Sequence, residues 1–188
     1  MKICPSNLTN KQLNKLSLKS LLLLALAIFC RVSELSSISR EEIVFDSRGA
    51  SFKLMRLRKN QRKGALVRIS INRWETDSLL CPVHALERYL TISLELPILA
   101  SSSLFVALNR PHKAVGPSTI ARWLKEALSK AGVDVGKFSA HSTRGSATSN
   151  ALKNGTPVDE TLVAASWSNA KTFHRFYHCS TDHRDEQL

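Results

Sequence analysis

The stretch SAHSTRGSATSNALKNG, residues 139–155, holds the pattern from which we interpret the chain. His141 and Arg144 stand three residues apart near the start of a predicted helix, so their side chains project from one face, about one turn apart. Together with the backbone N–H groups of a helix N-terminus, they suit a tetrahedral anion such as a phosphate. The pattern H-x-x-R is weak by itself, because a solvated surface pair has the same spacing.

The composition favours a polyanionic partner. The 188 residues fit one domain with a sizeable core, and 43% hydrophobic with 22% charged residues is an ordinary globular balance. The 27 lysines and arginines outnumber the 15 acidic residues, which gives a net charge of +12 and a pI near 10.0. Such a surface favours nucleic acid ahead of an anionic membrane. Charge that serves only solubility is the alternative.

The cysteines and the apolar segments favour a soluble intracellular protein. Cys4, Cys30, Cys81 and Cys179 are widely spread without a CxxC pair, which fits a reducing compartment better than a disulfide framework. The apolar run 21–30 is too short to span a bilayer, and no signal pattern precedes it. We therefore expect no membrane partner, and a nuclear location if the host is eukaryotic.

Arg31 directly follows an apolar helix. Thr9 and Gln12 form a capping-box pattern that predicts a helix start, and the run 21–30 is apolar all round, which is typical of a helix in the core. An arginine at the end of a buried helix is costly unless it meets an anion or a carboxylate. Arg31 therefore either pairs with Glu34 or binds an anion.

A basic hairpin is predicted after this region. Residues 51–58 and 65–72 read as two strands joined by a turn at 60–64, and no acidic residue occurs from 47 to 74. Such a hairpin is suited to tracking a phosphate backbone, although a solvated edge strand is the alternative. The candidate DNA contacts on it are Arg56, Arg58, Arg62, Lys63 and Arg68.

The remainder of the chain reads as helices in one mostly helical domain. Pro82 suits the first turn of one helix, whose apolar face places Tyr89 in the core. Ser118 is the expected cap of the next helix. Further helices are predicted from His141 to Gly155, from Pro157 to Ala165, and over residues 171–179.

Three further stretches give the pattern at 139–155 its meaning. They are FCRVSEL at 29–35, ASW at 165–167 and TFHRFYH at 172–178. The ordered set Arg31, His141, Arg144, Trp167 and Tyr177 resembles the catalytic domain of the tyrosine recombinase/integrase family. It is similar in particular to the branch of eukaryotic mobile elements (DIRS-like and Crypton-like). The resemblance covers about residues 18–178.

The resemblance implies an architecture. It is an α+β fold, mainly α, in which a small antiparallel β-sheet packs against a helical bundle. Residues 1–188 would form a single catalytic domain, and we expect the N-terminal core-binding domain that usually clamps DNA in this family to be absent from this chain. The family usually has Thr-Gly before the arginine, whereas this chain has Phe29 and Cys30.

The resemblance also implies roles for the residues. Tyr177 is the expected nucleophile, and Arg31 with Arg144 would hold the phosphate oxygens through their planar guanidinium groups. His141 would stabilise the phosphorane or take the proton from Tyr177. Trp167 would donate a hydrogen bond to the phosphate or serve only as core.

The general acid is expected in the hairpin. The resemblance places a lysine there that protonates the leaving 5′-oxygen; Lys59 is our choice and Lys63 the alternative. His174 and His178 are expected to flank the nucleophile and contact phosphate. A zinc site formed with Cys179 and His183 is the less favoured alternative, because the spacing matches no known ligand set.

These residues together predict site-specific DNA strand cleavage and rejoining, as in recombination or integration of a transposable element. The resemblance implies a 3′-phosphotyrosine intermediate, no metal or nucleotide cofactor, double-stranded DNA as partner, and self-association on DNA as a dimer or tetramer. The alternatives are a non-catalytic DNA-binding protein derived from a recombinase and a type IB topoisomerase-like enzyme.

Overall fold

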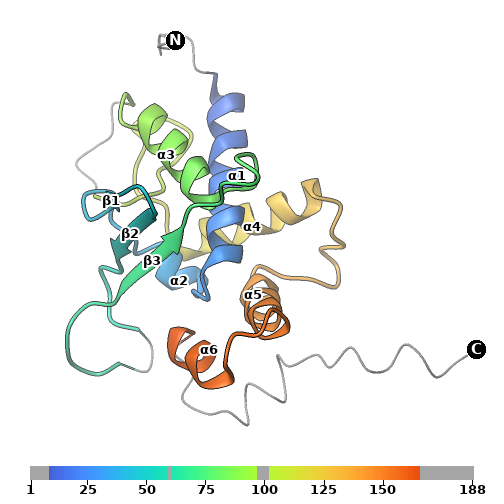
Figure 1. Cartoon of the computed structure of the whole chain (residues 1–188). Helices are drawn as coiled ribbons and strands as arrows, with labels where there is room; N and C mark the ends of the chain where they lie inside the picture. Colours follow the sequence, from blue (N-terminus) through green and yellow to red (C-terminus); the bar gives the residue numbers. More distant parts are fainter. Residues whose placement is uncertain (1–8, 59–60, 97–101, 166–188) are drawn as a thin grey trace, which may run out of the picture.

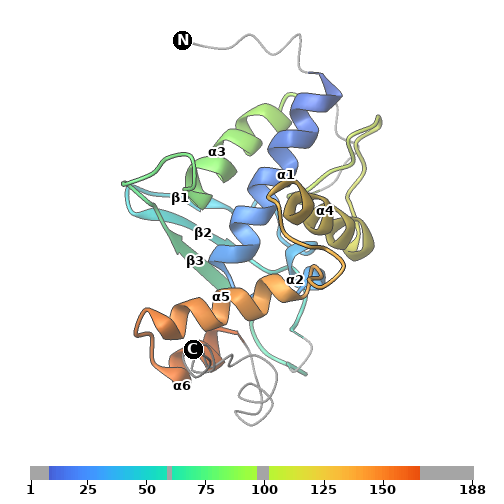
Figure 2. The ribbon, with the colours of Figure 1, turned by 90° about the vertical axis from the view of Figure 1, so that its right-hand side faces the viewer.

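Helix α1 is the element around which the rest of the chain packs. The computed structural model describes residues 9–58, 61–96 and 102–165. Helices α3, α4 and α5 all contact α1, and Figures 1 and 2 show α5 lying across its C-terminal end. The described helices are α1 (Asn10–Ala27), α2 (Val32–Leu35), α3 (Pro82–Ser93), α4 (Pro117–Lys130), α5 (Ser142–Lys153) and α6 (Val158–Ala164).

The predicted start of α1 is confirmed. The Thr9 hydroxyl accepts from the backbone N–H of Gln12, and the Gln12 side chain accepts from the backbone N–H of Thr9 at 2.9 Å. Both bonds satisfy N–H groups that have no partner within the helix. Leu21 and Leu24 are fully buried at the centre of the core. Because α1 is buried, its C-terminal end has a fixed position in the core, and Arg31 lies just after that end.

The sheet is antiparallel and small, with strands β1 (Val44–Phe45), β2 (Gly49–Lys53) and β3 (Arg68–Asn72) in that order. Side chains on its inner face, such as Phe52, are buried. Gly49 is required at its position, because a Cβ there would lie 2.0 Å from the carbonyl oxygen of Ile71. The α+β, mainly α architecture predicted from the sequence is confirmed.

The two basic strands are shorter than predicted. Pairing between β2 and β3 ends at Lys53 opposite Arg68, so the described residues from 55 to 66 form a loop rather than a tight hairpin. The physical reason is tertiary: Leu54 bridges to Ile38, and the N–H of Met55 donates to the carbonyl of Ser37 at 2.9 Å. The N–H of Leu54 still donates to the carbonyl of Val67 at 3.0 Å, but from Met55 on the backbone bonds to Ser37 instead.

The other described helices begin close to where they were predicted. Pro82 opens α3 after the cap Cys81, and Tyr89 is completely buried, as expected. The cap of α4 is Gly116 and not Ser118, because Pro117 already supplies the backbone angle of the first helical position. None of the described helices has the length and apolar character needed to cross a membrane.

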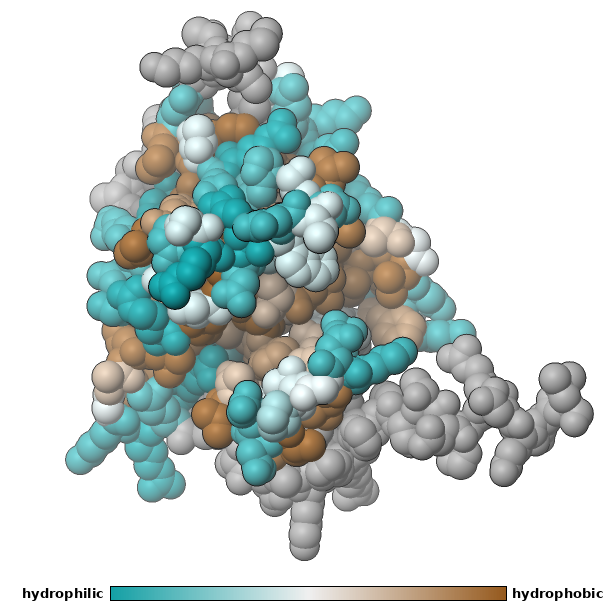
Figure 3. Space-filling model, in the orientation of Figure 1, coloured by the Kyte–Doolittle hydropathy of each residue, from teal (hydrophilic) through white to brown (hydrophobic). Residues whose placement is uncertain are grey.

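An apolar hollow of about 730 Å³ lies between α1, β3 and α5. Its lining includes Leu26, Trp74, Leu80 and Ala147. Figure 3 shows hydrophobic residues gathered between the upper body of the molecule and α5. The hollow separates α5 in part from the sheet, while the contact of α5 with α1 holds the helix in place.

Candidate functional site

Arg31 and Glu34 form the first part of the site, immediately after α1. One carboxylate oxygen of Glu34 accepts from the backbone N–H of Arg31 at 2.8 Å, and the other accepts from its Nη1 at 3.0 Å. Glu34 is buried (6% exposed), and Arg31 is half-buried at the N-cap of α2. The predicted ion pair is therefore confirmed. It orients the guanidinium of Arg31 at the surface of the site.

Helix α5 supplies the second part. The backbone N–H of Ser139 donates to the Ser142 hydroxyl at 3.1 Å, and the Ser139 hydroxyl accepts from the N–H of His141 at 3.2 Å. These bonds order the turn in which His141 caps α5. Arg144, one turn later, is 3% exposed, and its Nη2 donates to the carbonyl of Ala165 after α6.

The electrostatics of His141 show that the two parts meet. Partial burial lowers the pKa of His141 below 6.5, and the positive charges of Arg144 and Arg31 lower it further. His141 itself keeps an exposed side. A neutral imidazole beside two guanidinium groups can accept a proton or donate a hydrogen bond near neutral pH. Arg31 and Arg144 thus both lie close enough to His141 for their charges to act on its imidazole.

Arg58 belongs to this site in a way that the sequence did not indicate. We expected it on an exposed hairpin with the other basic residues, but it is 7% exposed and lies against Glu34 and Cys30. Burial, together with the nearby Glu34 carboxylate, raises the pKa of the Cys30 thiol to about 12, so this predicted core cysteine stays neutral. Nothing in the basic run distinguishes Arg58 from Arg56 or Arg62.

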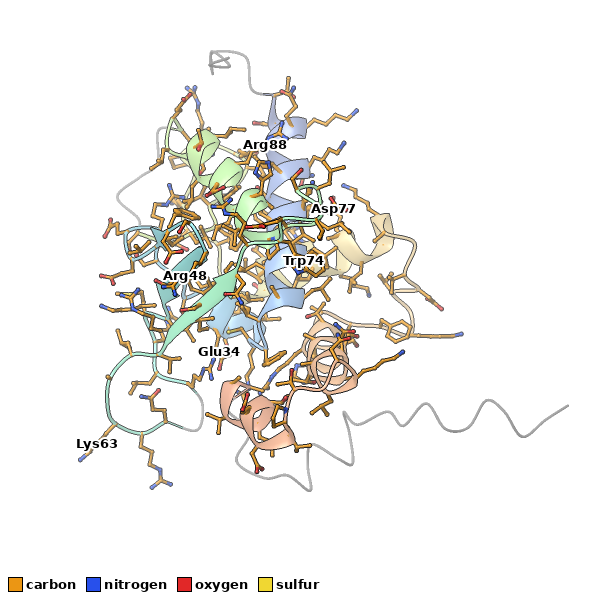
Figure 4. The ribbon with its side chains drawn as sticks, in the orientation of Figure 1. Glu34, Arg48, Lys63, Trp74, Asp77 and Arg88 are labelled. Atoms are coloured by element: carbon orange, nitrogen blue, oxygen red, sulfur yellow. The ribbon has the colours of Figure 1, made fainter. Side chains whose placement is uncertain are left out.

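The other basic residues of the loop lie at the surface. Arg56, Arg62 and Lys63 are exposed, and Figure 4 shows Lys63 at the far end of the loop, pointing away from the body. Arg68 is also exposed but lies 3.9 Å from Glu42, a carboxylate that precedes the acid-free run. The loop therefore offers cations to solvent, while the adjacent strands carry partly neutralised ones.

Several predicted site residues lie outside the part of the chain that the structure describes. They are Lys59, Trp167, His174, Tyr177 and His178, together with Cys179 and His183 of the zinc alternative. Among the described residues, no group of three or more His, Cys, Asp or Glu side chains is arranged to hold a metal ion.

We predict a pH dependence for His141. Because its pKa in the folded protein is below 6.5, the unfolded chain binds the proton more readily, so this residue lowers stability as the pH falls below about 6.5. NMR titration of its imidazole, assigned with His141→Gln, should give a pKa below 6.5 that rises when inorganic phosphate is added. A pKa at or above 6.5 in the phosphate-free protein would contradict the proximity of both arginines.

The comparisons with solved structures point to one fold. The chain is similar to the XerA recombinase (21% identity, TM-score 0.64), with 92% of this chain and 59% of that chain covered. It is also similar to the XerH site-specific recombinase bound to difH substrate in a pre-cleavage complex (14%, 0.66), with coverages of 96% and 46%. The chain is also similar to the Tn1549 transposon integrase in complex with circular intermediate DNA, with 14% identity and a TM-score of 0.59. That match covers 96% of this chain and 63% of the integrase chain.

This chain thus spans about half to two thirds of the length of those proteins. A search of curated proteins finds no match. The sequence model of the phage integrase family, in contrast, matches residues 3–183, nearly the whole chain. Together with the fold and the clustering of Arg31, His141 and Arg144, this match shows that the chain belongs to the phage integrase (tyrosine recombinase) family.

Proposed function

We propose that the protein cleaves and rejoins DNA strands through a covalent bond between Tyr177 and a 3′-phosphate. The observation that carries the proposal is the convergence of Arg31, His141 and Arg144. Arg31 and Arg58 face the same carboxylate, that of Glu34, so the cluster keeps a positive charge. A phosphate diester supplies the negative charge that such a cluster attracts.

The chemistry requires charge compensation at the phosphate. In the proposed step, the Tyr177 oxygen forms a bond to phosphorus while the bond from phosphorus to the 5′-oxygen breaks. Arg31 and Arg144 hold the two non-bridging oxygens through hydrogen bonds that strengthen as negative charge develops. The planar shape of a guanidinium group matches the phosphate oxygens and allows two parallel hydrogen bonds to them.

Two proton transfers complete the step. A phenol ordinarily has a pKa near 10, so a tyrosine nucleophile needs a base, and His141 beside the arginines is suited to that task. The leaving 5′-oxygen takes a proton from Lys59, with Lys63 as the alternative. Rejoining is the reverse reaction, in which a 5′-hydroxyl attacks the phosphotyrosine and releases Tyr177. The covalent bond conserves the free energy of the broken one.

The partner is double-stranded DNA, with association of two or four copies at the site. Relatives of this fold are described as bound to DNA, one of them, lambda integrase, as a dimer on a core site. The spacing of TF-x-x-x-Y at 172–177 further supports a place in the eukaryotic mobile-element branch. In that case the reaction takes place in the nucleus.

The exposed loop gives a prediction for binding. Because Arg62 and Lys63 are exposed, we expect them to contact the DNA backbone and release counterions. Affinity for duplex DNA should fall steeply with salt, and the double variant Arg62→Gln/Lys63→Gln should reduce the slope of log K against log salt by about two. Titration by fluorescence anisotropy measures this.

The matched control for the loop is Lys11→Gln/Lys15→Gln. These lysines are exposed on α1, near its N-terminal end, whereas the site lies at the opposite end of that helix. The control removes the same charge from the protein. Equal slopes for the two double variants, or an affinity independent of salt, would mean that the loop does not contact the phosphate backbone.

Covalent trapping tests the proposed function. Duplexes that carry a nick close to the cleavage point lose a short fragment after cleavage, so the reverse reaction has no 5′-hydroxyl to use. The wild-type protein should then form a DNA adduct that survives a denaturing gel, also in EDTA. If well-folded protein binds these duplexes but forms no adduct with any of them, the non-catalytic DNA-binding alternative replaces the proposal.

A further inference from the structure

Helices α5 and α6 form a unit at one end of the molecule. Figures 1 and 2 show the two helices together, below the other labelled elements. Helix α6 packs against α5, and α5 packs against α1. The apolar hollow of about 730 Å³ lies between part of α5 and strand β3, so the packing of α5 onto the body is incomplete. Since Arg144 lies on α5, its place in the site depends on what else holds this unit.

Two buried arginines meet the C-terminal end of α6. Nη1 of Arg58 donates to the carbonyl of Ala164 at 2.9 Å, and Nη2 of Arg144 donates to the carbonyl of Ala165. Carbonyls at the end of a helix lack a partner within it and carry partial negative charge, so guanidinium groups are favourable there. Both side chains are less than a tenth exposed. Neighbouring carbonyls of one helix end therefore hold both guanidinium groups.

The other side of the Arg58 guanidinium faces the body of the molecule. Its Nε lies 3.8 Å from Oε1 of Glu34, and its Nη2 lies 3.9 Å from the Cys30 sulfur. Glu34 belongs to α2, and Cys30 precedes that helix. The separation of 3.8 Å is longer than a hydrogen bond, so the attraction between two buried charges holds Arg58 on this side.

These contacts connect the two arginines that face the phosphate in the proposed step. Arg31 is bonded to Glu34 through its backbone N–H and its Nη1, and this ion pair orients it. Arg58 lies between the carboxylate of Glu34 and the end of α6, to which Arg144 is bonded. Arg58 comes from the loop after β2, so its side chain joins α2 to the α5–α6 unit.

We propose that Arg58 is a positioning residue that keeps Arg144 opposite Arg31 by tying the end of α6 to Glu34. Both guanidinium groups act on one phosphate, and misplacement of a catalytic group by about 1 Å is enough to lower a rate strongly. The proposal rests on the proposed function, since it concerns the place of Arg144 in the same cleavage step. Arg58 itself does not touch the phosphate.

The first test uses the protein without DNA. The charges of Arg144 and Arg31 help to keep the pKa of His141 below 6.5. Arg58→Lys keeps the positive charge, but a single ammonium group cannot hold the carbonyl of Ala164 and face Glu34 as the planar guanidinium does. The untied unit should then move away from Arg31, because like charges repel, and NMR titration should show the pKa of His141 rising towards 6.5. An unchanged pKa in folded Arg58→Lys would overturn the proposal.

Arg88→Lys is the matched control for the titration. Arg88 is exposed on α3, and Figure 4 shows it at the opposite end of the molecule from α5 and α6. The same exchange of side chains there should leave the pKa of His141 as in the wild type. Thermal denaturation of each variant separates stability from position, because a purely structural role lowers the melting temperature without changing the pKa of His141 in the folded protein.

The second test is single-turnover cleavage of the nicked duplex at saturating protein. Arg58→Lys should slow cleavage on the order of thirtyfold through misplacement of Arg144. Its affinity for DNA should change less than about threefold, because a buried residue does not neutralise phosphates. In the Arg144→Ala background, Arg58→Lys should cost less than about threefold, since the residue that it positions is gone. An equal cost in both backgrounds would overturn the proposal.

Arg58→Gln is the second variant if Arg58→Lys does not fold. Its shorter, neutral side chain does not join the two partners, and the cleavage comparison in the Arg144→Ala background then decides. If neither variant folds, Arg58 is required for folding and the proposal is overturned. A wild-type protein without any adduct contradicts the proposed function, while the titration of His141 still tests Arg58. Adducts from the wild type beside an equally fast Arg58→Lys refute the role of Arg58 alone.

Discussion

Alanine in place of Arg144 is expected to slow DNA cleavage by on the order of a hundredfold or more, as loss of one preorganised oxyanion donor does. Affinity for DNA should change far less. The reason is that Arg144 is buried and its guanidinium is held by the carbonyl of Ala165, so its orientation in the site is fixed. Negative charge on the phosphate oxygens is greatest in the transition state, so removal of the Arg144 guanidinium raises the energy of that state more than the energy of bound DNA.

The same result is expected for Arg31→Ala, since Arg31 contributes the second guanidinium. Arg144→Lys serves as the matched variant: it keeps the charge but loses the planar pair of donors, so it should restore little activity. Single-turnover rates and equilibrium binding should be measured on the same duplex. If cleavage and affinity fall by equal factors, the two arginines only hold the DNA backbone.

The sequence predicted local features of the structure well. The capping box at Thr9, the ion pair of Arg31 with Glu34 and the core position of Tyr89 are all confirmed. Each depends on neighbouring residues or on helical spacing, which a sequence displays directly. The clustering of Arg31 with His141 and Arg144 followed from family resemblance, because no local pattern shows that α1 and α5 meet.

Features that depend on tertiary contacts were missed. Arg58 was expected among exposed cations, but its side chain reaches Glu34 and the end of α6, which lie far from it in the sequence. The run 47–74 contains no acidic residue, yet Glu42, which precedes it, lies 3.0 Å from Lys53 and pairs with it. Charge patterns along a chain do not reveal such partners, because the fold brings them in from other segments.

Tyr177→Phe is expected to abolish the covalent adduct with DNA completely. The change removes one hydroxyl and keeps the aromatic ring, so folding and DNA affinity should match the wild type. The only other tyrosine, Tyr89, is completely buried in α3 and accepts a hydrogen bond from the N–H of Val106. Burial raises the pKa of its phenol, which makes it still less suited to attack a phosphate.

Tyr89→Phe is the matched control. It should form the adduct as the wild type does, at the cost of some stability from the lost hydrogen bond. An adduct that persists in Tyr177→Phe would refute Tyr177 as the nucleophile. Loss of the adduct in Tyr89→Phe, in protein that folds and binds DNA, would indicate that Tyr89 is the nucleophile instead.

The most direct measurement is mass spectrometry of the trapped adduct after digestion with trypsin and nuclease. Cleavage after Arg175 and Arg184 places Tyr177 on the peptide of residues 176–184, which contains no other tyrosine. The account predicts that this peptide carries the mass of a nucleotide joined through its 3′-phosphate. A nucleotide on any other peptide, or a bond through a 5′-phosphate, would contradict it.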